Sequence, residues 1–362
     1  MNKDKYWLAF SSVEKLSANF VLNLFMHFDN IEQAWTVSPA EIVKVEGITK
    51  RQIDYFLNNR NKVNPDECYE FIAKRGIDYI TYDSENYPPL LKEIYNPPIV
   101  LFVRGDLSTC NLKKTLAVVG SRKASSSAKD SLSKIIAEFA NSDICIVSGL
   151  AEGIDGVAHS SALNYGLKTI AVIGHGFDYC YPSTNKHLYK EIEKNGGAII
   201  TEYWPTFPPI AWRFPQRNRI VSGLSYGTLV VEAALKSGAL ITANLTLEQG
   251  RELMCMPGAL NNPNTEGIYK LLKDGAAMAT CAQDILDVLG WQFIVEKKVL
   301  TAEFNLSPLE QKIYDFVSVE SKSFDDIILK LGVDFSELTS VLTMMELKGI
   351  IKQTQQGGYI KV

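Results

Sequence analysis

The sequence has no long apolar run and few of the residues from which disulfides and metal sites are built. None of its hydrophobic stretches approaches the ~20 consecutive apolar residues of a membrane-spanning helix. Residues 1–10 mix polar and aromatic side chains, unlike a secretory signal peptide. The six cysteines include no CxxC pair, and no two of the four histidines have metal-ligand spacing. We therefore expect a cytoplasmic protein that is not inserted in a membrane and that needs no disulfide, metal or cofactor.

The chain also lacks an excess of positive charge. Its formal net charge is −4, and residues 115–285 contain fifteen basic and fifteen acidic side chains. This balance counts against indiscriminate electrostatic binding to nucleic acid, so a nucleic-acid site would have to come from local clustering of cations. A length of 362 residues with 46% hydrophobic and 22% charged residues predicts a globular protein of two to three domains.

The first predicted domain, residues 1–65, is a small helical module. Ser38 and Pro39 are a suitable N-cap and first residue of a helix. Residues 45–49, centred on Gly47, predict a tight turn to the next helix, as in the helix-hairpin-helix and SAM-like modules. Such a turn can offer backbone N–H groups to a DNA phosphate, but a purely structural packing module is the favoured interpretation.

The second predicted domain, residues 66–290, alternates short apolar runs with helical stretches. Six runs of strand length lie at residues 116–119, 144–147, 169–173, 198–201, 228–231 and 253–256. Helices are expected between them at residues 125–140, 154–165, 185–194, 217–224 and 239–249. Continuous apolar strands between helices indicate a doubly wound, Rossmann-like parallel sheet of the α/β class. Residues 66–114 read as an extension of that sheet.

The third predicted domain, residues 300–362, has the pattern of a winged helix. Three helices, at residues 309–317, 324–331 and 335–347, precede two short strands separated by residues 355–358. Residues 291–362 carry eight lysines and no arginine against ten acids, and the last helix region includes Asp334, Glu337 and Glu346. Because a helix that reads duplex DNA should not be acidic, we favour a protein-interaction role over duplex sensing.

Two segments after predicted strands have the chemistry of anion sites. Gly120-Ser121-Arg122 precedes a run of serines at a helix start, and Lys236-Ser237-Gly238 stands at another helix start. Glycine lets a phosphate approach the backbone, while serine, a helix N-terminus and a cation supply donors. Ligands of parallel α/β sheets bind beyond the carboxyl ends of the strands, where both segments lie. Arg251 is a weaker candidate, since it precedes its strand.

The densest cationic cluster is residues 212–219. It holds three arginines, Arg213, Arg217 and Arg219, interleaved with Trp212 and Phe214. Guanidinium groups that hold phosphates beside rings that stack on bases are typical of single-strand binding. The alternative is an arginine-rich helix start that makes ion pairs, but few acids lie nearby in the sequence.

Candidates for catalysis are isolated. His159 lies on an apolar helix and is interpreted as a packed residue, and His175 with Asp178 has no nucleophile poised beside it. Glu232, after the glycine-containing run at residues 223–228, keeps one enzyme alternative open: a nucleotide phosphoribohydrolase-like Rossmann enzyme that uses this carboxylate.

Several motifs in consistent order resemble the DNA-processing protein A family, also called Smf. They are Val119-Gly120-Ser121-Arg122, the run from Ser148 to Asp155, Ala171-Val172-Ile173-Gly174, Tyr181-Pro182, the run from Phe214 to Ile220, the run from Lys236 to Thr242, and Met256-Pro257-Gly258. The resemblance covers about residues 82–286.

The resemblance implies a protein that binds and protects single-stranded DNA, forms a homodimer through its Rossmann-like domain, and helps to load the RecA recombinase in natural transformation and recombination. It implies no catalytic residue. The family's DNA-contacting motifs fall on Ser121, Arg122, Phe214, Arg217, Asn218, Arg219, Lys236, Ser237 and Gly238. Relatives often have a lysine just after the Tyr-Pro pair, where this chain has Ser183, so either Lys186 replaces that lysine or one phosphate contact is missing.

Overall fold

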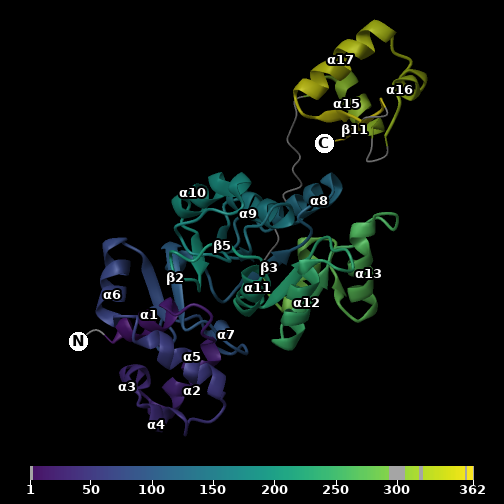
Figure 1. Cartoon of the computed structure of the whole chain (residues 1–362). Helices are drawn as coiled ribbons and strands as arrows, with labels where there is room; N and C mark the ends of the chain where they lie inside the picture. The colour runs from purple at the N-terminus through teal and green to yellow at the C-terminus, as the bar shows by residue number, and fades with distance from the viewer. Residues whose placement is uncertain (1–2, 293–305, 318–320, 355–356, 362) are drawn as a thin grey trace. The chain divides into compact units, whose positions relative to one another are not determined.

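The computed structural model describes residues 3–292, 306–317, 321–354 and 357–361. The chain divides into two compact units, residues 1–295 and 296–362 (Figure 1). The larger unit holds both the N-terminal helices and the central sheet, and the smaller unit holds the C-terminal helices. The domain boundary between residues 65 and 66 stays a prediction.

The centre of the larger unit is a nine-stranded sheet in the order β1-β2-β6-β5-β4-β3-β7-β8-β9. The parallel strands are β3 (Thr115–Val119), β4 (Cys145–Ser148), β5 (Lys168–Val172), β6 (Ala198–Thr201), β7 (Gly227–Val230), β8 (Glu252–Cys255) and β9 (Ala277–Met278). Beginning at β3, the chain adds strands on one side as far as β6 and then returns to place β7 on the other side. The doubly wound Rossmann-like prediction is confirmed, and the reversal of strand order lies between β3 and β7.

Helices cover both faces of this sheet. They are α8 (Ser126–Ala137), α9 (Ile154–Asn164), α10 (Lys186–Lys194), α11 (Arg213–Gly223), α12 (Gly238–Glu248), α13 (Glu266–Lys273) and α14 (Ala282–Leu289). Successive residues of β3 point to opposite faces. Accordingly, Leu116 and Val118 pack in the core beneath α8, α9 and α14, while Ala117 and Val119 pack beneath α11, α12 and α13.

Helix α11 begins four residues earlier than the predicted helix at residues 217–224. Its first turn contains Arg213, Phe214 and Pro215, so the arginine–aromatic cluster is itself helical. Proline is tolerated in the first turn because its missing N–H would have no intrahelical acceptor there. The early start matters because it fixes the spacing of the side chains that reach the site.

The expected extension joins the sheet at its β6 edge. Strand β1 (Asp78–Thr81) pairs antiparallel with β2 (Val100–Gly105), and β2 pairs antiparallel with β6. A short helix, α7 (Pro89–Lys92), lies between β1 and β2 in the sequence. Short 3-10 turns at Leu107–Thr109, Ser183–Asn185 and Pro263–Thr265 complete the connections.

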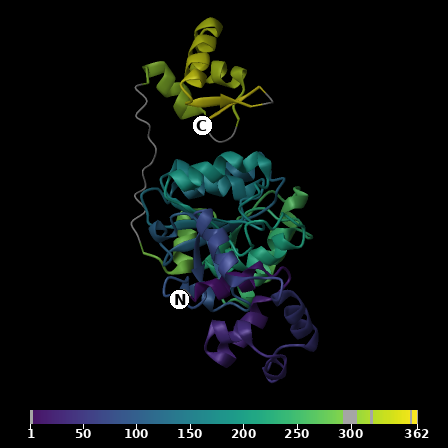
Figure 2. The ribbon, with the colours of Figure 1, turned by 60° about the vertical axis from the view of Figure 1, so that its left-hand side comes forward.

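The N-terminal helices pack as a group against the β1–β2 side of the sheet (Figure 1, Figure 2). They are α1 (Asp4–Ser12), α2 (Ala18–Phe28), α3 (Ile31–Thr36), α4 (Pro39–Ile42), α5 (Lys50–Arg60) and α6 (Pro65–Lys74). Phe10, Trp35 and Phe56 form their aromatic core, with ring centroids 4.9–5.6 Å apart. Ser38 caps α4 as predicted, and Gly47 has the positive φ of 75° that the turn to α5 requires.

The part of the smaller unit that the structure describes contains three helices and a β-hairpin. The elements are α15 (Pro308–Phe316), α16 (Phe324–Leu331), α17 (Phe335–Leu347), and the antiparallel strands β10 (Ile351–Gln353) and β11 (Tyr359–Lys361). Ile313, Ile327 and Leu342 are among the buried residues of its separate core. The winged-helix prediction is confirmed for this fold, while residues 300–305 and 355–356 of the predicted domain lie outside the described residues.

Candidate nucleic-acid interface

A cavity of about 660 Å³ opens at the carboxyl ends of the strands, where the strand order reverses. Its walls come from the loops after β3, β4, β5, β6 and β7 and from helices α11 and α12. Eight of the nine predicted site residues line it: Ser121, Arg122, Phe214, Arg217, Asn218, Lys236, Ser237 and Gly238. The fold therefore brings the loop after β3 together with α11 and with the segment Lys236–Gly238, which lie about 90 and 115 residues further along the sequence. Arg219 does not line this cavity.

The loop after β3 packs closely against the loop after β4. This packing leaves the Arg122 side chain facing solvent. The Ser121 carbonyl accepts a hydrogen bond of 3.2 Å from the Ile154 N–H. A Cβ atom on Gly153 would lie 2.3 Å from that carbonyl oxygen, and Gly153 has a φ of 77°. Glycine is thus required for the close approach of the two loops. Arg122 is exposed at the mouth of the cavity.

Ser125 and Glu232 anchor the same loop from behind. The Ser125 N–H and hydroxyl donate to the Glu232 carboxylate at 2.9 and 2.7 Å, and the Asn262 amide donates to it at 2.8 Å. Glu232 is 2% exposed and does not line the cavity. Its carboxylate is occupied in holding the cap of α8, so the geometry does not support the hydrolase alternative.

Phe214 forms an aromatic wall of the cavity. Its ring lies 5.3 Å from that of Tyr181, at an interplanar angle of 36°, and the Arg122 guanidinium lies 5.8 Å from its centroid. A Cβ atom on Gly174 would lie 2.9 Å from the Phe214 ring. The ring can occupy this position because residue 174 is glycine and has no side chain. Tyr181 is absent from the predicted site residues. The Tyr-Pro motif that contains it was the available signal.

Another wall of the cavity is formed by Lys236, Ser237 and Gly238. Ser237 caps α12 by accepting a hydrogen bond of 3.2 Å from the Ala239 N–H, and Lys236 is exposed. A Cβ atom on Gly238 would meet no heavy atom within 4 Å, so the space in front of this helix start is open. The N-terminus of α12 carries partial positive charge, which adds to that of Lys236.

Arg217 lines the cavity but is almost entirely buried, with 4% of its surface exposed. Its Nη1 donates to the Gly149 carbonyl at 2.6 Å and to the Val172 carbonyl. Burial lowers the pKa of this guanidinium, against the opposing effect of the Asp155 carboxylate. Asp155 in turn accepts a hydrogen bond of 3.1 Å from the Gly149 N–H. Arg217 therefore ties the ends of β4 and β5 together behind the cavity.

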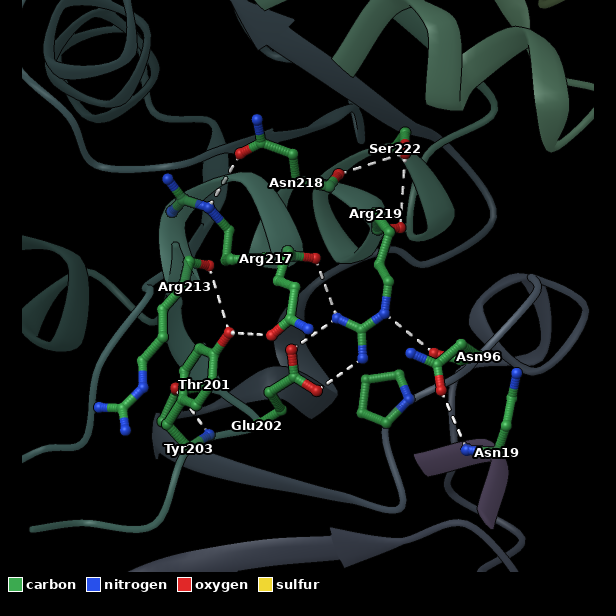
Figure 3. Close-up of polar contacts among 12 residues, drawn as sticks. Asn19, Asn96, Thr201, Glu202, Tyr203, Arg213, Arg217, Asn218, Arg219 and Ser222 are labelled. Carbon is green, nitrogen blue, oxygen red and sulfur yellow. Dashed lines mark hydrogen bonds and ion pairs between the residues drawn. The ribbon is translucent and has the colours of Figure 1, made fainter. Parts of the chain in front are cut away.

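Arg219 is held away from the cavity by an acid. Its two Nη atoms bind the Glu202 carboxylate at 2.5 and 2.6 Å, and its Nε donates to the Asn96 carbonyl at 2.9 Å (Figure 3). Burial alone would lower the pKa of Arg219. The charge of Glu202 and its hydrogen bonds to Arg219 have the opposite effect, and the pKa of Arg219 is raised. Arg219 is 8% exposed.

Arg213 is also committed to internal contacts. It is fully buried and makes a salt bridge of 2.6 Å with Glu14 of the N-terminal helical group. The ion-pair alternative therefore holds for Arg213 and Arg219, although few acids lie near them in the sequence. Their partners are 199 and 17 residues away in the sequence, so the pairing could not be found locally.

The histidines show packing rather than acid–base chemistry. His159 is fully buried, and its Nδ1 lies 2.7 Å from the Thr169 hydroxyl, which itself donates to the Ile146 carbonyl. Its burial and its contact to Thr169 agree with its interpretation as a packed residue, and burial lowers the pKa of His159 to about 3. His175 is buried beside Tyr189, whereas Asp178 pairs with Arg75 at 3.3 Å.

The remaining cationic candidates lie elsewhere. Arg251 binds Glu93 at 2.9 Å and the Leu90 carbonyl, and neither Arg251 nor Lys186 lines the cavity. Within the described ranges, no three His, Cys, Asp or Glu side chains are grouped to hold a metal ion. Among the helices that the structure describes, none is long and apolar enough for a membrane span.

Comparison with known proteins decides the family. The model described as DNA recombination-mediator protein A matches residues 78–290, which is more than half of the chain, and the DprA winged helix domain matches residues 300–357. The chain belongs to the DNA recombination-mediator protein A family. Members of the family are DNA-binding recombination mediators rather than enzymes.

Relatives of this mediator family are similar over most of their length. Protein Smf of Escherichia coli is 37% identical over an alignment of 333 residues that covers 89% of this chain and 87% of that protein. DNA processing protein DprA of Streptococcus pneumoniae is 44% identical over 55% of this chain and 70% of that protein.

Two solved structures of family members share the fold. The X-ray structure of DprA from Streptococcus pneumoniae has a TM-score of 0.70 and 34% identity, covering 81% of this chain and 99% of that chain. A structure of DNA processing protein A from Helicobacter pylori, described by its single-stranded DNA binding mode, has a TM-score of 0.53 and 31% identity, covering 59% and 95%.

Proposed function

We propose that the protein binds single-stranded DNA in the cavity at the strand ends. The observation that carries this proposal is the arrangement of two exposed cations, Arg122 and Lys236, on a cavity that also contains the Tyr181–Phe214 ring pair. The cations and the start of α12 hold successive phosphates, and Phe214 stacks on a base. The likeness to the Helicobacter pylori protein, whose structure is described by its single-stranded DNA binding, supports this assignment.

The other site residues have supporting parts in this proposal. Ser121, Ser237 and Gly238 offer hydroxyl or backbone donors to the phosphates, and Asn218 lines the cavity beside Arg217. Arg217 and Arg219 act by bracing α11 and not by direct contact. Contacts to phosphates, together with stacking, carry no base identity by themselves. Duplex DNA binds weakly in this scheme because its paired bases are not free to stack.

The proposal extends to protein partners. We place the protein in the protection of incoming DNA and in the loading of RecA during natural transformation and recombination, in the cytoplasm and as a homodimer. Support comes from its membership of a mediator family and from apolar side chains that face solvent on the Rossmann-like domain. Ile241 and Leu247 of α12 and Met278 of β9 are 42%, 56% and 58% exposed, a character suited to protein contacts.

The winged-helix unit is proposed to contact protein. Leu329, Phe335 and Leu347 on its α16 and α17 are each at least 66% exposed, and Glu337 lies on the same α17. An acidic helix with apolar side chains on its surface repels phosphate and offers area to a protein.

Fluorescence anisotropy tests the DNA proposal. The probe is a labelled 20-nucleotide oligo-dT, compared with a duplex of the same length, for the wild type and for Arg122→Ala with Lys236→Ala. We expect a strong preference for the single strand that the double variant loses while its melting temperature is unchanged. Lys190→Ala with Lys194→Ala, two exposed lysines of α10, removes the same charge as a control and should bind like the wild type. Absence of binding by folded wild-type protein at low salt would refute the proposal.

A further inference from the structure

The rim of the cavity continues across the start of α11. Ala211 and Pro215 line the cavity and are exposed. Trp212 and Gln216, the residues that follow them, are also exposed but do not line the cavity. Residues four apart on a helical turn share a face, so the pair at 212 and 216 borders the pair at 211 and 215. An exposed surface without an acid therefore leads out of the cavity over the first turn of α11.

Two contacts fix the N-terminal helical group to α11. Arg213 Nη2 donates to Oε1 of Glu14 at 2.6 Å. Arg219 Nε donates to the Asn96 carbonyl, and the Asn96 side-chain oxygen accepts a hydrogen bond of 3.0 Å from the Asn19 N–H at the start of α2 (Figure 3). The helical group is thus held in a set position against α11.

Trp212 lies where α11 meets the helical group. The Arg213 guanidinium, which pairs with Glu14, is also 5.2 Å from the centroid of the Trp212 ring. The indole is 40% exposed, so part of its ring surface is open to solvent. An exposed aromatic ring that a cation holds in place is a suitable platform for a base of a single strand.

Two cations of the helical group lie around Glu14. Lys15 follows it in the turn between α1 and α2 and is exposed. The Tyr55 hydroxyl of α5 donates to the Glu14 carbonyl at 2.6 Å. Arg51 is four residues before Tyr55, so it lies on the same face of α5, and it is exposed. Neither cation makes a salt bridge among the described residues, so both are available to phosphates.

The backbone of Lys15 is in the left-handed region. Its φ of 64° favours glycine, and a lysine there has a cost in backbone energy. The Lys15 side chain makes no salt bridge within the described ranges that compensates this cost. A residue held in such a conformation points to a function for its side chain. Here that side chain adds positive charge next to Glu14, whose own charge Arg213 compensates.

We propose that the bound strand continues from the cavity across the start of α11 onto the N-terminal helical group. Trp212 stacks on a base there, and Lys15 and Arg51 hold phosphates. This second segment of contacts rests on the proposed single-strand function and lies outside the cavity at the strand ends. Asp54, three residues after Arg51, is exposed, so solvent and salt screen its charge.

Fluorescence anisotropy with the labelled 20-nucleotide oligo-dT tests the two cations. Lys15→Gly with Arg51→Ala should raise the dissociation constant about tenfold, since exposed charge pairs are weaker than those at the cavity. The slope of log affinity against log salt should become shallower by about 1.4, corresponding to two phosphates. Glycine suits the φ of residue 15, so the variant should not lose stability through backbone strain.

Lys3→Ala with Lys62→Ala is the matched control. It removes the same charge from the same helical group, but at the opposite ends of α1 and α5. We expect this control to bind like the wild type. An equal loss in the control would overturn the second segment, because the effect would then come from diffuse charge.

Photochemical cross-linking tests the stacking on Trp212. A 20-nucleotide strand with 5-iodouracil in place of thymine cross-links to aromatic side chains that stack on its bases. Trypsin cleaves between Arg213 and Phe214, so Trp212 and Phe214 fall in different peptides. We expect cross-links in both peptides. Trp212→Leu should remove the cross-link from the peptide that ends at Arg213 and weaken binding about fivefold, the lower end for one base stack.

The outcomes separate the second segment from the proposed function. An unchanged affinity and salt slope in the Lys15 and Arg51 variant, with loss of binding in the Arg122 and Lys236 variant, would overturn the second segment and leave the function standing. Cross-links absent from the peptide that ends at Arg213 would overturn the stacking on Trp212. Failure of the folded wild type to bind the strand at low salt would refute the proposed function itself.

Discussion

Arginine occurs both at the mouth of the cavity and in the buried framework behind it, which consists of α11 and the segments that bind its arginines. The two sets of arginines have different roles. At the mouth, Arg122 is exposed, and its guanidinium lies over an aromatic ring and makes no salt bridge among the described residues. In the framework, Arg213, Arg217 and Arg219 are 0%, 4% and 8% exposed and are bound to carboxylates or carbonyls. Residue type alone therefore does not identify a phosphate contact in this fold. Exposure and the partner of the guanidinium decide which role it has.

Removal of a framework arginine should have the largest effect. Arg219→Ala leaves Glu202 partly buried without its bidentate partner, which should cost about 3–5 kcal/mol of the free energy of unfolding. Chemical unfolding followed by circular dichroism measures this loss. Arg219→Lys should recover only part of it, because an ammonium cannot bind both carboxylate oxygens in the same planar fork. If Arg219→Ala unfolds like wild type but no longer binds DNA, Arg219 belongs with the mouth residues instead.

Removal of the mouth cations should leave stability intact and weaken binding. Arg122→Ala with Lys236→Ala should raise the dissociation constant of oligo-dT by about a hundredfold, if each lost charge-assisted contact costs at least about 1.5 kcal/mol. The slope of log affinity against log salt should also become shallower by about 1.4, corresponding to two phosphate contacts. A variant with an unchanged slope would show that these side chains do not meet phosphate.

The buried histidine of the framework predicts a pH dependence of stability. The pKa of His159 is about 3 in the folded protein and 6.5 for an ordinary histidine, so below pH 6.5 the unfolded chain binds the additional proton. His159 therefore destabilises the fold as the pH falls, by about 1.4 kcal/mol per pH unit, or about 2 kcal/mol from pH 6.5 to 5. Unfolding of wild type and His159→Gln at pH 7.5, 6.5 and 5 measures the difference in slope. Parallel pH profiles would contradict a neutral, buried His159.

Substitution of Phe214, the aromatic residue at the mouth of the cavity, should have the smallest of these effects. Phe214→Ala should weaken oligo-dT binding by about tenfold, the lower part of the range for loss of one base stack. Phe214→Leu is the informative control because it keeps apolar volume against Gly174 but removes the π face. If Phe214→Leu binds like wild type, the ring acts by filling space and not by stacking.

Much of the fold was predictable because it depends on local periodicity. The six apolar runs became β3 to β8, and the glycine, serine and proline signals placed the ends of several helices correctly. The start of α11 was predicted four residues too late, since Pro215 reads as a helix boundary but is tolerated in a first turn. Two strand pairings could not be predicted from local periodicity because they depend on contacts between distant segments. They are the pairing of β9 with β8 and the antiparallel pairing of β2 with β6.

By itself, the sequence determined the alternation of strands and helices, and with it the edge of the sheet at which Ser121, Arg122, Lys236, Ser237 and Gly238 must gather. Parallel strands all present their carboxyl ends at one edge, so this conclusion needs no coordinates. The tertiary structure decided which arginines of α11 face that edge. Glu14, Glu202, Asn96 and the ends of β4 and β5 reach α11 from remote parts of the chain and occupy Arg213, Arg219 and Arg217. A buried cation takes its role from the partner that compensates its desolvation, and that partner is chosen by the fold.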